Sequence, residues 1–90
     1  MSVFHYVYVL RSLRTGRHYI GYTSDLRRRI QEHLAGRSRT TSLMRPFILV
    51  YYEACRSQST ATQRERQLKS MSGWRYLKRR LIDDSGAARG

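Results

Sequence analysis

The sequence predicts an α+β fold, in which a three-stranded antiparallel sheet is flanked by helices in the order ββαβαα. Two alternating segments, residues 4–11 and 17–23, lie on either side of a turn signal at Gly16. This spacing is typical of a β-hairpin. Residues 26–34 then repeat apolar side chains at helical intervals. A third apolar strand segment and two more helical patterns follow along the chain.

Side chains of the hairpin alternate between two faces, because successive residues of a strand point to opposite sides of a sheet. In the first strand Tyr6 and Tyr8 share one face, and the valines beside them share the other. In the second strand Tyr19 and Gly21 share a face. We therefore expect tyrosines from two adjacent strands on one side of the sheet.

The first helix is expected after a Thr-Ser-Asp run that supplies a hydroxyl cap and an acid in the first turn. The stripe that we expect to be buried consists of Leu26, Ile30 and Leu34. Gly36 suits the C-terminal end of this helix. A polar loop over residues 36–46 connects it to the third strand.

The third strand is expected over residues 47–53, which are apolar enough for a central or well-covered strand. A second helix is expected to open at Ser59-Thr60. Thr60 and Gln63 match a capping box there, and the helical pattern runs to about Met71.

A break is expected at Ser72-Gly73. Beyond it, Trp74, Leu77 and Leu81 recur at helical spacing and predict a third helix with one apolar stripe.

Ninety residues make one domain, which we place at residues 1–82, with a disordered polar tail at residues 83–90. No apolar run approaches the roughly 20 residues that span a bilayer, and no signal-peptide layout is present. Cys55 is the single cysteine, which excludes a disulfide framework and a cysteine-rich zinc site. These features predict a cytoplasmic protein.

The chain carries 18 Lys and Arg against 6 Asp and Glu, a formal net charge of +12. The electric field of a chain with this net positive charge attracts polyanions, and nucleic acid is the default partner. The other explanation is compositional, because nearly all of these residues are arginines, which codon usage alone can favour.

Position 65 is the most informative candidate for chemistry. Ala61, Glu65 and Leu68 fall on one helical face, which should pack against the sheet. A buried carboxylate is unfavourable by several kcal/mol unless it is paired or bound to a metal. The sequence leaves three alternatives: a buried ion pair, a metal or catalytic site, or an exposed glutamate on a misplaced helix.

Arg29 and His33 lie at the edge of the expected stripe of the first helix, from which both could lean over the sheet. For Arg29 the alternative is a solvated surface residue. His33 suits an acid, a base or a phosphate donor, or else a half-buried helix residue. Tyr8 and Tyr19 could pack across the strands or place their hydroxyls beside a catalytic water.

These residues together resemble the GIY-YIG endonuclease superfamily over residues 4–82. The two triplets that name the superfamily read Tyr6-Val7-Tyr8 and Tyr19-Ile20-Gly21 here, followed by Arg29, His33 and Glu65 in order. The chain is similar to the N-terminal nuclease domain of the nucleotide-excision-repair excinuclease and to small single-domain bacterial members. The leading Gly of the first triplet is Tyr6, and an Asn that follows the glutamate in some members has no clear counterpart.

The resemblance implies a metal-dependent endonuclease that hydrolyses phosphodiester bonds in DNA and leaves a 5′-phosphate and a 3′-hydroxyl. Glu65 would bind Mg²⁺, with Mn²⁺ as an alternative, and Tyr19 would take a proton from the attacking water. Tyr8 would orient that water, Arg29 would hold the phosphate, and His33 would donate to the phosphate or assist proton transfer.

The remaining positive charge is expected to hold DNA with little base specificity, in a role such as DNA repair. The expected contacts are Arg27, Arg28, Arg37, Arg39, Arg45, Lys69, Arg75, Lys78 and Arg79. Two other functions stay open at this point. One is a nucleic-acid-binding module without turnover, and the other is an adaptor that docks on a repair complex through Trp74.

Overall fold

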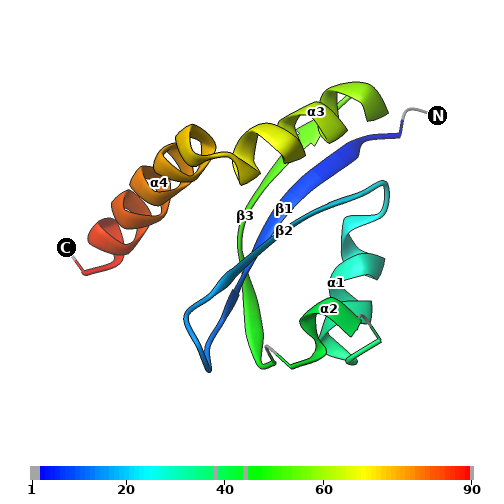
Figure 1. The fold of residues 1–90 in the computed structure, drawn as a ribbon. Coiled ribbons are helices and arrows are strands. Elements are labelled where there is room, and N and C mark those ends of the chain that lie inside the picture. The colour runs from blue at the N-terminus through cyan, green and yellow to red at the C-terminus, as the bar shows by residue number, and fades with distance from the viewer. Residues whose placement is uncertain (1–2, 38, 44, 90) are drawn as a thin grey trace.

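A computed structural model of the chain describes residues 3–37, 39–43 and 45–89. Its three-stranded antiparallel sheet and flanking helices confirm the predicted α+β fold. Figure 1 shows the arrangement of the sheet and of the helices that flank it.

The sheet contains β1 (His5–Ser12), β2 (His18–Thr23) and β3 (Phe47–Cys55) in the order β2-β1-β3. Both neighbours pair antiparallel with β1, and Tyr8 lies between Gly21 of β2 and Tyr52 of β3. The predicted hairpin of β1 and β2 is therefore confirmed. The register to β3 shifts between Val9 and Leu10.

The helices are α1 (Leu26–Leu34), α2 (Arg39–Ser42), α3 (Gln58–Lys69) and α4 (Met71–Arg89). In the view of Figure 1, α1 and α2 lie on one side of the sheet, and α3 and α4 lie on the other. None of the helices within the described residues is long and apolar enough to cross a membrane.

Two apolar cores follow from the alternation along β1. On one face Val7 and Val9 pack with residues of α3 and α4, where Ala61, Leu68 and Leu77 are buried. On the other face the second core is built around three buried residues, Tyr8, Leu10 and Phe47. Tyr19, Leu26 and Ile30 pack against this second core.

Two sequence predictions about buried surfaces are wrong. Leu34 is 51% exposed, because the buried stripe of α1 continues from Ile30 to His33, which is fully buried, instead of to Leu34. The third strand is neither central nor well covered, because β1 occupies the centre of the sheet. As a result Ile48 and Tyr52 of β3 are exposed.

The boundaries of α3 also differ from the prediction. The cap is Ser57, whose Oγ accepts from the backbone N–H of Thr60 at 3.1 Å, so the capping box at Thr60 is wrong. The break after α3 falls at Ser70. Gly73 lies within α4 instead, where a Cβ would collide with the backbone carbonyl of Gln67. Glycine here permits the close turn from α3 into α4.

Two further segments differ from the sequence expectation. The polar loop expected over residues 36–46 contains the short helix α2. Helix α4 includes residues 83–89, where a disordered tail was expected, and Gly90 lies outside the described residues. The end of α1 agrees with the prediction, with Ala35 as its cap and Gly36 following at φ 78°.

A partly buried ion pair ties α3 to the edge strand β3. Arg64 donates from Nε and Nη2 to the two carboxylate oxygens of Glu53 at 2.8 and 2.7 Å. Tyr51 donates its hydroxyl to the same carboxylate at 2.6 Å. The hydrogen bonds from Arg64 hold the pKa of Glu53 below its usual value. A bidentate pair of this kind is specific in geometry as well as favourable in energy.

We predict that Glu53→Gln lowers the free energy of unfolding at pH 7 by about 2 kcal/mol, because charge-assisted hydrogen bonds to Arg64 are weakened. The folded pKa of Glu53 is below the unfolded value, so its stabilisation is present above about pH 4.3 and is lost as the pH falls through the folded pKa. Urea unfolding at pH 7 and at about pH 3 measures both effects.

The matched control for this prediction is Glu65→Gln, which alters an ion pair within one helix, Glu65 with Lys69 at 3.1 Å. A pair of this type contributes little to stability, so the control should unfold close to the wild type. Equal stability of Glu53→Gln and wild type at pH 7 would contradict the prediction.

Candidate active site

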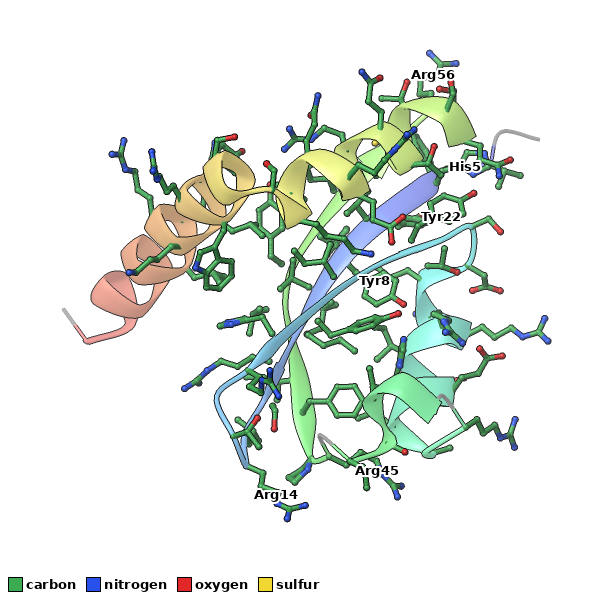
Figure 2. All side chains as sticks on the ribbon, viewed as in Figure 1. His5, Tyr8, Arg14, Tyr22, Arg45 and Arg56 are labelled. Carbon is green, nitrogen blue, oxygen red and sulfur yellow. The ribbon has the colours of Figure 1, made fainter. Side chains whose placement is uncertain are left out.

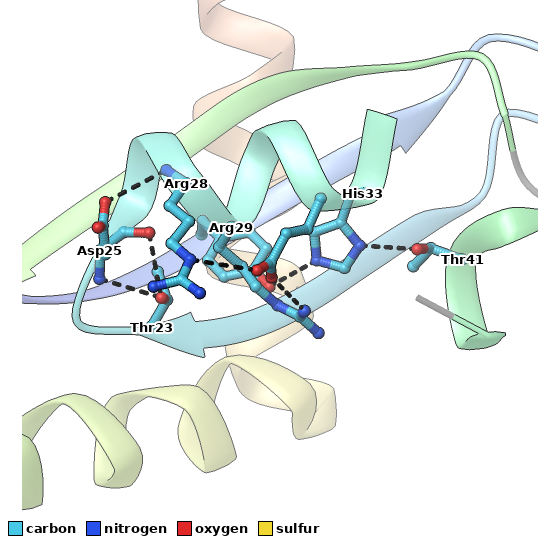
Figure 3. A network of polar contacts seen from close by, with 8 residues as sticks. Thr23, Asp25, Arg28, Arg29, His33 and Thr41 are labelled. Carbon is cyan, nitrogen blue, oxygen red and sulfur yellow. Dashed lines mark hydrogen bonds and ion pairs between the residues drawn. The ribbon is translucent and has the colours of Figure 1, made fainter. Parts of the chain in front are cut away.

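A chain of buried hydrogen bonds links the centre of the sheet to α1 and α2. The Tyr8 hydroxyl bonds to Nε2 of His33 at 2.8 Å, and Nδ1 of His33 bonds to Oγ1 of Thr41 at 2.7 Å. All three side chains are buried. Figure 3 shows His33 reaching from α1 towards Thr41. Burial of these polar groups is tolerated because each finds a partner.

Glycine at position 21 makes room for this chain. Gly21 lies opposite Tyr8 in the sheet, and a Cβ there would lie 2.5 Å from the Tyr8 hydroxyl oxygen and 2.9 Å from Cε2 of Tyr19. Any larger side chain would displace one of the two tyrosines. The packing of Tyr8 and Tyr19 therefore requires glycine at the last position of the second triplet.

Tyr8, Tyr19 and His33 form one aromatic cluster. The Tyr19 ring lies 6.3 Å from the Tyr8 ring and 5.3 Å from the His33 ring, measured between centroids. Tyr8 is 1% exposed, whereas Tyr19 is only half-buried. Of the two phenols, Tyr19 is thus the one that solvent or a substrate reaches more easily.

Arg29 projects from α1 beside the tyrosines. Its Nη1 donates to Oε1 of Glu32 at 2.9 Å, and its side chain is 33% exposed. The pKa of Arg29 is raised, first by Glu32 and then by its contact with Tyr8. Arg28, on the solvent side of the same helix, also pairs with Glu32, as the dashed contacts in Figure 3 show.

Glu65 lies on α3, at the margin of the face that buries Ala61 and Leu68. Its side chain is 23% exposed, and its Oε2 accepts from Nζ of Lys69 at 3.1 Å. The buried ion pair expected as one alternative is thus not found, because Glu65 pairs within its own helix with a Lys69 side chain that is 53% exposed. Lys69, which bonds to Glu65, lines a surface hollow together with Tyr19.

The environment keeps Tyr8 and His33 neutral. Burial raises the pKa of Tyr8 to about 12, although the Arg29 guanidinium opposes this shift. Burial and the nearby Arg29 lower the pKa of His33 below its ordinary value. A neutral imidazole has one N–H and one acceptor nitrogen, which matches one bond to Tyr8 and one to Thr41.

The donor set around Glu65 fits a hydrated Mg²⁺ better than a protein-caged ion. The described residues contain no group of three or more His, Cys, Asp or Glu side chains arranged to hold a metal. Mg²⁺ keeps several waters and often uses only one or two carboxylates. A single carboxylate with an exposed fraction is compatible with that behaviour.

The expected basic contacts come from α1, the segment after it, α3 and α4. Arg45 donates from Nε to the carbonyl of Ser42, and Lys69 pairs with Glu65. The side chain of Arg39 lies outside the described residues. The remaining expected contacts are exposed: Arg27, Arg28, Arg37, Arg75, Lys78 and Arg79.

Two residues of the site were not singled out from the sequence. Glu32 follows Arg29 by three positions, and that spacing on a helix is a signal that could have found the pair. Thr41 gave no signal, because its role depends on how α2 folds back onto His33. Its hydroxyl is buried although its neighbourhood in sequence is polar.

Comparisons with known proteins agree with this geometry. The family model of the GIY-YIG catalytic domain matches residues 4–77. A UPF0213 protein of Natronomonas pharaonis is 44% identical over 85 residues, covering 93% of this chain and 96% of that protein. A UPF0213 protein of Staphylococcus haemolyticus is 39% identical over 75 residues, covering 82% and 90%.

One solved structure is also similar. The solution NMR structure of a UPF0213 protein from Bacillus halodurans has a TM-score of 0.52 and 37% sequence identity, and the match covers 89% of this chain and 83% of that one. A small α+β domain that matches the GIY-YIG catalytic domain is a member of a nuclease superfamily. The chain belongs to the GIY-YIG family.

We predict that Thr41→Val lowers the free energy of unfolding by about 1–3 kcal/mol, because Nδ1 of His33 loses its buried partner while the side-chain volume is kept. Thr41→Ser, which retains the hydroxyl, should be less destabilised. Urea unfolding measures the stability, and ¹⁵N NMR of the imidazole reports the tautomer. Equal stability of the valine and wild-type proteins would show that the bond contributes nothing.

Proposed function

We propose that this protein is a divalent-metal-dependent endonuclease that hydrolyses phosphodiester bonds in DNA with low sequence specificity. The observation that carries the proposal is the cluster of Tyr8, Tyr19 and His33 with Arg29. Glu65 bonds to Lys69, which lines one hollow with Tyr19. A GIY-YIG nuclease domain implies nucleic-acid binding and suggests endonuclease activity. DNA is proposed because of the resemblance to the nuclease domain of a DNA excinuclease.

Tyr19 is proposed to accept the proton of the attacking water. It is the more accessible of the two phenols, and its ring stands against His33 and Tyr8. An ordinary tyrosine with a pKa near 10 is a weak base at neutral pH.

Tyr8 and His33 are proposed as positioning residues in this mechanism. Both are buried, and the two ring nitrogens of His33 already bond to Tyr8 and Thr41. His33 is therefore better placed to orient the Tyr8 hydroxyl than to touch a phosphate. A Tyr8 with a pKa of about 12 keeps its proton and can act as an oriented hydrogen-bonding group.

Arg29 is proposed to hold the phosphate and to offset the charge that develops on its oxygens. A guanidinium suits this role because its planar donors match phosphate oxygens in pairs. In the free protein Glu32 holds Arg29 over the site. Glu32 thereby keeps the guanidinium extended beside the tyrosines before substrate arrives.

Glu65 is proposed to hold the metal, with Lys69 fixing one of its carboxylate oxygens. A bound Mg²⁺ would polarise the phosphate and lower the pKa of a coordinated water. Low sequence specificity is proposed because the positive charge is spread over α1 and α4, where arginines and lysines contact phosphates rather than base edges.

The adaptor alternative receives less support than catalysis. It requires an exposed Trp74 surface, but Trp74 is half-buried and packs on the core of Val7 and Val9 and against His18. A binding module without turnover remains the second candidate, and the Glu65 experiment separates it from the nuclease.

We predict that Glu65→Gln abolishes cleavage and leaves nucleic-acid binding nearly intact, because glutamine keeps the size and removes the charge that holds the metal. The assay presents plasmid, branched, single-stranded and RNA substrates to both proteins, with Mg²⁺ or Mn²⁺ and with chelator. Cleavage by the folded variant at the wild-type rate would exclude Glu65 as the ligand. Absence of cleavage by the wild type on every substrate would favour the binding module.

We predict that Arg29→Ala lowers kcat by about 10²–10³-fold, as loss of a group that stabilises developing charge does. Arg27→Ala is the matched control from the same helix, because Arg27 is exposed and lines the hollow at Tyr6 and Tyr52 instead of the one at Tyr19. It should weaken binding and leave kcat nearly unchanged. Single-turnover and steady-state kinetics separate the two effects. Equal losses of kcat would mean that α1 acts only as a basic surface.

A further inference from the structure

A surface hollow of about 350 Å³ lies beside the site, between β2 and the junction of α3 with α4. It is lined by His18, Tyr19, Ile20, Leu68, Lys69 and Trp74. The Trp74 ring stands 4.9 Å from the His18 ring at 58°, measured between centroids and ring planes. The hollow therefore combines aromatic and aliphatic walls with a polar rim at Tyr19 and Lys69.

The hollow is continuous with the candidate active site through two residues. Tyr19 lines it and also belongs to the aromatic cluster with Tyr8 and His33. Lys69 lines it and also bonds to Glu65. A phosphate bound beside Tyr19 would thus place an attached nucleoside within reach of the hollow.

The larger hollow of about 540 Å³ at Tyr6 and Tyr52 differs in this respect. It lies against α1 and includes Arg27, but none of the five proposed catalytic and positioning residues lines it. Of these two hollows, the one at Trp74 is shared with the cluster that is proposed to cut the strand. Figure 2 shows Tyr8 of that cluster at the centre of the sheet, between the two pairs of helices.

Resting on the proposed nuclease function, we propose that the hollow at Trp74 is a subsite for one unpaired nucleobase of the substrate strand, next to the phosphate that is cut. A base presents a flat apolar face to Trp74 and polar edges to the rim. Aromatic side chains bind bases in this way with little sequence preference. A base within a duplex is covered on both faces by its neighbours, so the subsite takes a base that has left the stack.

Trp74 is the only tryptophan of the chain, so its fluorescence reports occupancy of the hollow directly. Wild-type protein in chelator is titrated with a single-stranded oligothymidylate and with an abasic oligomer carrying the same number of phosphates. The oligothymidylate should quench the fluorescence and bind about tenfold more tightly than the abasic oligomer, because stacking on aromatic side chains contributes on that scale. Equal affinities without differential quenching overturn the subsite.

The variant test uses Trp74→Leu, with Tyr52→Leu as the matched control from the other hollow. Trp74→Leu should lower affinity for the oligothymidylate about tenfold and leave affinity for the abasic oligomer unchanged. Tyr52→Leu should change neither affinity. An equal loss in both leucine variants, or an equal loss for both oligomers with Trp74→Leu, overturns the assignment. The wild-type titration stands without either variant if Trp74→Leu does not fold.

These experiments test the nuclease function and the base subsite independently of each other. Wild-type protein that shows differential quenching but cuts no substrate overturns the nuclease and keeps the base site. Wild-type protein that cuts with Mg²⁺ but shows no differential quenching overturns the base site and keeps the nuclease.

Discussion

The side-chain alternation of the central strand β1 is the constraint on which the rest of this structure depends. Because β1 is paired on both edges, its side chains have only the two faces of the sheet to occupy. Val7 and Val9 are completely buried beneath α3 and α4. Tyr8 and Leu10 are buried on the opposite face, beneath α1. A shift of one residue in register would send the valines to the site and the tyrosine into an apolar core.

The placement of Tyr8 in turn requires a polar chain within the second core. A buried phenol needs a hydrogen-bond partner, which for Tyr8 is His33. The second ring nitrogen of His33 is buried as well and bonds to Thr41. These bonds join β1 to α1, across 25 positions of the sequence between Tyr8 and His33, and α1 to α2. The same burial that keeps Tyr8 and His33 neutral therefore also fixes where α1 stands over the sheet, and with it the position of Arg29.

Sequence patterns predicted the fold because it depends on local periodicity and spacing, whereas the residues of the cluster were predicted from the resemblance to the GIY-YIG superfamily. The hairpin, the helix that carries Arg29 and the helix that carries Glu65 all have period-2 or helical signals. The errors have a different physical origin. That β3 is an edge strand depends on strand order, and that His33 rather than Leu34 is buried depends on where α1 ends. The burial of Thr41 depends on how the segment after α1 folds back so that α2 contacts His33.

Tyr8 and Tyr19 belong to one hairpin but lie in different environments. Tyr8 comes from the central strand and lies beneath α1, so it is sealed and holds its proton. Tyr19 comes from the edge strand β2, so it keeps an open side towards α3 and the hollow at Trp74. The edge position of β2 thus supplies the access that the central strand lacks. The proposed mechanism requires both tyrosines. The buried Tyr8 is a fixed positioning group, and the more accessible Tyr19 accepts a proton from the attacking water.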